Sequence, residues 1–106
     1  MTILLHGNGI VDAHDRALHI VDLDRPTPSV LTIVLHDFDR AGLKLVVLDA
    51  DNRQLFYDVS CLDTGYQIRG EFRLPAGVHT IRIRVSSPLR HTTQFRLTLA
   101  DTGDEL

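Results

Sequence analysis

Apolar and polar residues alternate strictly along three segments in the C-terminal third of the chain. Residues 66–74, 79–86 and 94–99 place hydrophobic side chains at every second position except Gly70 and His79, with polar or charged side chains at most positions between them. Because successive side chains of a β-strand point to opposite faces of the sheet, this period of two predicts three half-buried strands. Pro75-Ala76-Gly77 has the chemistry of a turn, so the first two segments are predicted to form an antiparallel hairpin.

Earlier in the chain the hydrophobic residues are more continuous. Residues 29–36 and 43–49 are rich in valine, isoleucine and leucine, which is typical of strands that are central or covered on both faces. Shorter candidates lie at 2–5 and 18–23, separated by Gly7-Asn8-Gly9, and a further one lies at 54–58. About eight short strands without an amphipathic helix predict an all-β fold, an antiparallel two-sheet β-sandwich of the jelly-roll or Greek-key type.

The chain has the size and composition of one globular domain. It contains 106 residues, of which 43% are hydrophobic and 24% charged, so residues 1–106 are expected to form a single β-sandwich domain. No apolar run approaches the ~20 residues of a membrane-spanning helix, and the start lacks a signal-peptide pattern. We therefore expect no membrane partner and a cytoplasmic protein, or an extracytoplasmic one if the sequence is an excised domain. The single cysteine, Cys61, excludes an internal disulfide.

Arginines on the polar side of the three alternating strands form the first candidate site. If the predicted hairpin forms, the arginines of its strands become neighbours on one outer face, joined by another if the third strand lies in the same sheet. The candidate residues are Arg69, Arg73, Arg82, Arg84 and Arg96. Such a basic face could bind a polyanion or the acidic end of a second copy. Alternatively, it only keeps an exposed sheet in solution.

The distribution of charge bears on nucleic acid as a partner. The formal net charge is −3, with aspartates concentrated near the predicted turns of the first 65 residues and arginines in the strands that follow. This arrangement disfavours a uniformly basic nucleic-acid binder. No aromatic side chains interleave the arginines to stack on bases, so nucleic acid is not expected as a partner.

Aspartates in two predicted turns form the second candidate site. Asp37 and Asp39 lie in one turn and Asp49 and Asp51 in the next, and carboxylates are the hard oxygen ligands that Ca²⁺ prefers. The strand between the turns separates them by roughly 20 Å at ~3.3 Å per residue. That separation favours the alternative in which each aspartate stabilises its own turn.

The sequence contains no recognisable catalytic motif. The six histidines lack the spacing of a transition-metal site, and no nucleophile motif of a known hydrolase occurs. We therefore expect no enzyme, and no cofactor other than Ca²⁺.

Several sequence segments between Val30 and Leu99 follow a pattern shared with a known family. They are Leu31-Thr32-Ile33-Val34-Leu35, Leu43-Lys44-Leu45-Val46-Val47-Leu48 followed by Asp49-Ala50-Asp51-Asn52, Leu74-Pro75-Ala76-Gly77, and Phe95-Arg96-Leu97-Thr98-Leu99. On these segments the chain resembles the bacterial pre-peptidase C-terminal (PPC) domain family, whose members are small β-sandwich modules appended to secreted proteases and other exported proteins. A second likeness, to the tellurium-resistance TerD-like sandwich proteins, rests on Leu48-Asp49-Ala50-Asp51 and residues 101–106. No calcium ligands are carried over from either family.

The strand pattern without assembled catalytic chemistry predicts a non-catalytic interaction module that binds a protein partner or associates with itself. The alternative is a ligand-binding module for carbohydrate, a polyanion or Ca²⁺, suggested by the resemblance and the Asp-rich turns. The chain has no tryptophan, and its only tyrosines are Tyr57 and Tyr66. This counts against carbohydrate, because sugar rings stack on aromatic side chains.

Overall fold

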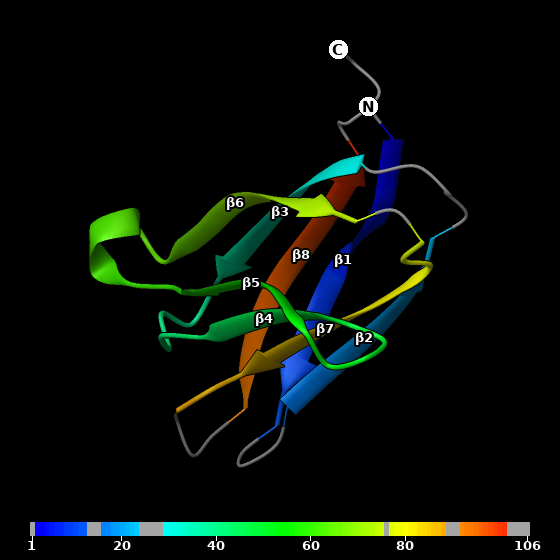
Figure 1. Cartoon of the computed structure of the whole chain (residues 1–106). Coiled ribbons are helices and arrows are strands. Elements are labelled where there is room, and N and C mark those ends of the chain that lie inside the picture. Colours follow the sequence, from blue (N-terminus) through cyan, green and yellow to red (C-terminus); the bar gives the residue numbers. More distant parts are fainter. Residues whose placement is uncertain (1, 13–15, 24–28, 76, 89–91, 102–106) are drawn as a thin grey trace.

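The structure, a computed structural model, describes residues 2–12, 16–23, 29–75, 77–88 and 92–101. Within these ranges the elements are β1 (Thr2–Val11), β2 (Arg16–Asp22), β3 (Ser29–Asp37), β4 (Lys44–Asp49), β5 (Gln54–Val59), the 3₁₀ helix η1 (Leu62–Thr64), β6 (Gln67–Leu74), β7 (Thr80–Ser86) and β8 (Thr93–Asp101). The strands form two four-stranded antiparallel sheets that pack face to face (Figure 1). The predicted all-β sandwich of about eight strands is therefore confirmed.

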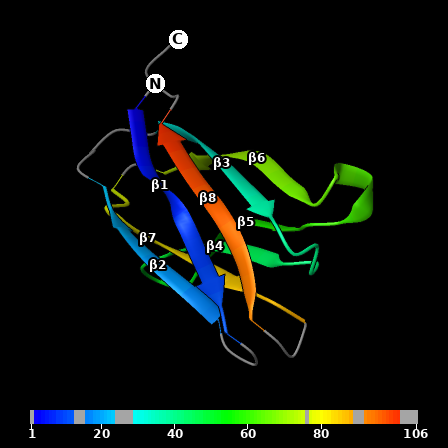
Figure 2. The ribbon, with the colours of Figure 1, turned by 180° about the vertical axis from the view of Figure 1, so that it is seen from behind.

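The chain crosses between the two sheets at most of its connections. Sheet A has the strand order β1-β8-β3-β6, and sheet B has the order β2-β7-β4-β5. Only β4 and β5 are neighbours both along the chain and within a sheet. Figures 1 and 2 show the two layers from opposite sides, with β1 and β2, one edge strand of each sheet, on the same side of the sandwich.

The predicted hairpin of residues 66–74 and 79–86 is wrong. β6 pairs with β3 at the edge of sheet A, whereas β7 lies between β2 and β4 in sheet B. The connection from Leu74 to Thr80 therefore joins the two sheets instead of turning within one. A period of two shows which face of a strand is buried, but it does not show which strand lies beside it.

One hydrophobic core fills the space between the sheets. The central strands of both sheets, together with β6, contribute alternate side chains that are at most 1% exposed, and each buried Leu, Ile or Phe stabilises the fold by about 1.5–3 kcal/mol. These residues are Leu31, Ile33, Leu35, Leu45, Val47, Ile68, Leu74, Ile81, Ile83, Val85, Phe95, Leu97 and Leu99. No helix in the described part of the chain is long and apolar enough to cross a membrane.

The expectation that Gly7-Asn8-Gly9 separates two strands is also wrong, because these residues lie inside β1. Gly9 stands opposite Phe95 of β8 in the strand register. A Cβ atom at Gly9 would overlap the Phe95 ring. The glycine is thus needed for the close approach of an aromatic ring to the strand, and it does not mark a turn.

Candidate functional site

The structure divides the five predicted arginines between two surfaces. Arg69 and Arg73 of β6 and Arg96 of β8 lie on the outer face of sheet A, whereas Arg82 and Arg84 of β7 lie on the outer face of sheet B. The expectation that they form one continuous basic face is wrong, because it depended on the β6–β7 hairpin. Whether any of these arginines binds a ligand stays a prediction.

On sheet A the arginines have different surroundings. The Nε atom of Arg96 donates a hydrogen bond to Asn8 Oδ1 at 3.1 Å, and its guanidinium carbon lies 5.4 Å from the centroid of the Phe38 ring. Arg69 and Arg73 flank Glu71 on the outer side of edge strand β6. The negative charge of Glu71 between them reduces the cationic character of this edge.

The outer face of sheet B combines its two arginines with aliphatic and aromatic side chains. Strand register places Arg84 between Leu18 of β2 and Val46 of β4, and it places Arg82 between Ile20 and Leu48 in the same way. Tyr57 of β5 stands next to Val46. We call this set the Arg82/Arg84 face: Leu18, Ile20, Val46, Leu48, Tyr57, Arg82 and Arg84.

Apolar residues on this face are unusually open to solvent. Leu18 is 55%, Ile20 63% and Tyr57 48% exposed, whereas residues at such positions of a solvated sheet are ordinarily polar. The sequence signal for the face is the continuous apolar run of residues 43–49, which places Val46 and Leu48 on the outer side of a central strand. The run predicted a central strand correctly, but no second layer within the described residues covers that outer side.

Arg82 is held by hydrogen bonds to the turn that follows β4. The guanidinium of Arg82 donates through Nη2 to the side-chain oxygen of Asn52 and to the backbone oxygen of Asp49 at 3.4 Å. Asn52 has a left-handed backbone with φ of 64°, which asparagine tolerates better than most residues. This local geometry fixes the position of the Arg82 side chain on the sheet.

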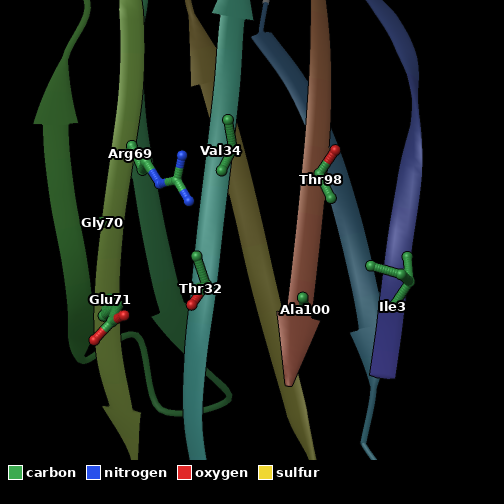
Figure 3. Close-up of a pocket in the computed structure, with 8 residues that line it drawn as sticks. All are labelled: Ile3, Thr32, Val34, Arg69, Gly70, Glu71, Thr98 and Ala100. Atoms are coloured by element: carbon green, nitrogen blue, oxygen red, sulfur yellow. The ribbon is translucent and has the colours of Figure 1, made fainter. Parts of the chain in front are cut away.

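An open depression of about 530 Å³ lies on the outer face of sheet A (Figure 3). Its floor consists of small side chains from the central strands β3 and β8: Thr32, Val34, Thr98 and Ala100. Arg69 and Glu71 line it on the β6 side, and Ile3 lines it on the β1 side. Figure 3 shows the Arg69 side chain extending from β6 across the floor toward Val34.

Asp37, one of the four candidate metal ligands, organises the turn before β4. The residue is only 5% exposed. One oxygen accepts the backbone N–H of Ala41 at 3.1 Å, and the other accepts the N–H groups of Gly42 and Leu43 at 2.9 and 3.3 Å. The second oxygen also accepts the hydroxyl of Ser60 at 2.6 Å. These donors come from the turn itself and from the end of β5, so they occupy both oxygens of the carboxylate.

Two of the other candidate aspartates also have structural partners. Asp49 accepts the N–H groups of Asp51 and Arg53 at 2.8 and 2.9 Å, and Asp39 accepts the N–H of Gln94 at 2.6 Å. β4 lies between the Asp37 turn and the Asp49 turn, as the sequence predicted. Among the described residues no three His, Cys, Asp or Glu side chains gather as a metal site, and Ca²⁺ binding stays untested.

The sequence matches no protein-family profile and no curated protein, whereas its fold matches many solved structures. The pre-peptidase C-terminal domain of a collagenase from Bacillus anthracis is 12% identical with a TM-score of 0.73, over 93% of this chain and 90% of that one. The mitogen from Yersinia pseudotuberculosis is 14% identical with a TM-score of 0.69, over 98% and 90%. PliG from Aeromonas hydrophila, a periplasmic inhibitor of g-type lysozyme, is 12% identical with a TM-score of 0.62, over 95% and 88%.

These likenesses establish a shared fold. Adhesin, carbohydrate-binding and lectin domains are also among the similar structures. The PPC-like fold predicted from the sequence segments between Val30 and Leu99 is confirmed, since a PPC domain superposes over almost the whole chain.

Proposed function

We propose that this chain is a non-catalytic protein-binding module whose Arg82/Arg84 face docks an acidic and apolar surface of a partner. The observation that carries the proposal is the placement of two arginines between exposed aliphatic side chains of β2 and partly exposed ones of β4, with a tyrosine beside them. Arginine and aromatic residues are enriched at the centres of protein interfaces, and aliphatic neighbours exclude water from the contacts that they make.

The charge of the face specifies the chemistry of the partner. Arg16 and Lys44 lie in the next row of the same sheet, so four cationic residues stand on this side of sheet B. The acidic residue of the described strands on this side is Asp22, which accepts a hydrogen bond from Thr80 at 3.2 Å. A partner with carboxylates among apolar side chains would therefore be attracted and oriented. Because Arg82 is already held by Asn52, less side-chain entropy is lost when it binds.

Two further observations support binding in preference to catalysis. Ser60 is buried and donates its hydroxyl to Asp37, so this serine and carboxylate serve the turn before β4 and are not exposed to a substrate. PliG, which has the same fold, is an inhibitor of g-type lysozyme, and the fold is thus compatible with the recognition of another protein.

Selection of peptides from a random display library tests this proposal. We expect enriched peptides to combine Asp or Glu with aliphatic or aromatic residues. Arg82→Glu with Arg84→Glu should weaken their binding at least about tenfold, or about 1.4 kcal/mol. The matched control is Arg69→Glu with Arg73→Glu, which changes the net charge equally on the other sheet and should leave binding unchanged.

Equal weakening by the two double variants would show that only net charge matters and would overturn the proposal. The same conclusion follows if the Arg69 and Arg73 pair alone controls binding. Thermal unfolding of each variant identifies any loss of binding that comes from a loss of fold.

A second candidate function concerns the depression on sheet A. Its volume lies within the range of small-ligand sites. Arg69 could bind a ligand carboxylate, Glu71 could accept hydrogen bonds from hydroxyls, and the small floor of Val34 and Ala100 leaves room for the C–H face of a ring. These features favour an acidic sugar as the ligand.

Titration with digalacturonate, followed by the amide NMR signals of Thr98 and Ala100, tests this second candidate. We expect the signals to shift on binding and the shifts to disappear in Arg69→Ala. Arg73→Ala, on the same strand but outside the depression, should retain them. Unchanged shifts in Arg69→Ala would contradict a site at this depression.

A further inference from the structure

β2 lacks the features that discourage pairing at the other sheet edges. It forms a regular register of seven residue pairs with β7 and has no second hydrogen-bonded partner among the described strands. By contrast, the pairing of β1 with β8 and that of β5 with β4 each contain a register shift, and β6 carries charged residues along its outer side. Bulges and charges are the usual means by which proteins prevent edge-to-edge association.

The side chains of β2 also favour pairing with another strand. Leu18 and Ile20 in the middle of the strand are both more than half exposed, while the charged residues Arg16 and Asp22 stand only at its two ends. The strand contains neither proline nor glycine. A regular strand with an apolar centre and a free edge is a template for pairing with another strand.

We propose that β2 pairs antiparallel with β2 of a second copy of this chain, about a twofold axis at His19. In this register Arg16 stands opposite Asp22 of the second copy, and the symmetry repeats the pair at the other end. Leu18 stands opposite Ile20 on the same face, also twice. Opposite charges and aliphatic pairs directly across an antiparallel ladder both stabilise it, so the strand is complementary to itself.

Neighbouring registers lose this complementarity. An axis at Leu18 would place Arg16 opposite Ile20, and an axis at Ile20 would place Asp22 opposite Leu18. In each case a charge faces an aliphatic side chain, and the oppositely charged end finds no partner within the paired strands. The register about His19 is therefore the one specified by the sequence of β2.

The dimer would join the two B sheets into one continuous sheet of eight strands. A twofold axis through the sheet places the outer faces of both copies on the same side, so two Arg82/Arg84 faces lie next to each other. The pairing itself does not depend on the proposed binding of an acidic partner. Because a single strand pair is a small interface, we expect a reversible dimer and not a permanent one.

Sedimentation velocity between about 5 and 500 µM tests for a dimer of this reversible kind. We expect the average mass to rise from monomer toward dimer with concentration. Asp22→Arg and Arg16→Asp should each weaken dimerisation about tenfold, since each places like charges opposite one another at both ends of the ladder. The double variant Arg16→Asp with Asp22→Arg restores opposite charges and should recover the dimer.

Cross-linking tests the register independently of these charges. With Cys61→Ser as background, His19→Cys should form a covalent dimer under mild oxidation, because residues directly opposite lie close to disulfide distance. Ala17→Cys is the matched control and should not cross-link, since it stands opposite Val21. A monomer at every concentration, or equal cross-linking of both variants, would overturn the proposal.

The variant Arg82→Glu with Arg84→Glu separates this inference from the proposed function. Its changes lie on β7, one strand away from the paired edge, so it should dimerise like the unaltered protein even when it no longer binds acidic peptides. Loss of the dimer in this variant would contradict pairing through β2 alone.

Discussion

Asp37 shows how one side chain can organise a turn whose partners lie far apart in the sequence. Its two oxygens accept hydrogen bonds from three consecutive backbone N–H groups and from the hydroxyl of Ser60. Ser60 in turn accepts the N–H of Leu43 at 2.8 Å and donates its own N–H to the oxygen of Leu43. This network joins the turn before β4 to the end of β5.

Asp37→Ala should destabilise the fold strongly. It would leave several buried donors without acceptors at about 1–3 kcal/mol each, for a total of about 3–5 kcal/mol. Asp39→Ala is the matched control, because Asp39 is exposed and accepts the N–H of Gln94. We expect it to cost at most about 1 kcal/mol. Urea unfolding measures both values, and equal losses would contradict the role assigned to Asp37.

At the scale of elements, an aromatic ring of β8 packs directly against the backbone of β1. Gly9 leaves space for the ring of Phe95, which is fully buried. The same ring meets His19 of β2 edge-on, with ring centroids 6.1 Å apart and an angle of 86°. Phe95 thus fills the space between the two edge strands on this side of the sandwich and links both to the core.

Gly9→Ala should lower stability by about 1–3 kcal/mol, because the added methyl group overlaps the Phe95 ring and forces strand or ring to move. Gly7→Ala, two residues earlier on β1, is the matched control. A Cβ atom there meets nothing within 4 Å, so we expect a neutral or slightly stabilising effect. The melting temperatures of the two variants provide the measurement. A similar decrease in both would contradict the assigned cause, because only the methyl group at Gly9 overlaps the Phe95 ring.

At the scale of the whole molecule, the two outer faces of the sandwich differ in character. Sheet A presents a depression bordered by Arg69 and Glu71, with small side chains on its floor. Sheet B presents arginines between aliphatic residues that are exposed on β2 and partly exposed on β4. The two proposed sites, one for a small ligand and one for a protein partner, therefore lie on opposite sides of the sandwich, so occupancy of one would leave the other accessible.

The fold class and most strands were predictable from the sequence, because burial of one face leaves a period of two in the chain. Residues 54–58 and 79–86, for example, correspond to β5 (Gln54–Val59) and β7 (Thr80–Ser86). Strand partners were not predictable in the same way. The turn chemistry of Pro75-Ala76-Gly77 fits a hairpin and a crossing between sheets equally well, and the chain makes the crossing.

The candidate sites could not be placed correctly without knowing which strands pair. Two arginines of different strands become neighbours only if their strands share a sheet, so Arg69 and Arg82 lie on opposite faces. The Arg82/Arg84 face arises from long-range pairing of β7 with β2 and β4. Likewise, the sequence favoured aspartates that stabilise their own turns. It did not show that Asp37 would also contact Ser60, because these two residues are distant in the sequence and meet only in the folded chain.

The topology also affects the order in which the protein can be completed during synthesis. β1 has β8 as its one neighbour in sheet A, and Thr2 pairs with Asp101 at the far end of their ladder. While the ribosome adds the intervening residues, the first strand therefore has no native neighbour in its sheet. Its side chains lack their packing against β8 until residues 93–101 emerge, so the nascent chain must avoid premature association while the strands between β1 and β8 are synthesised.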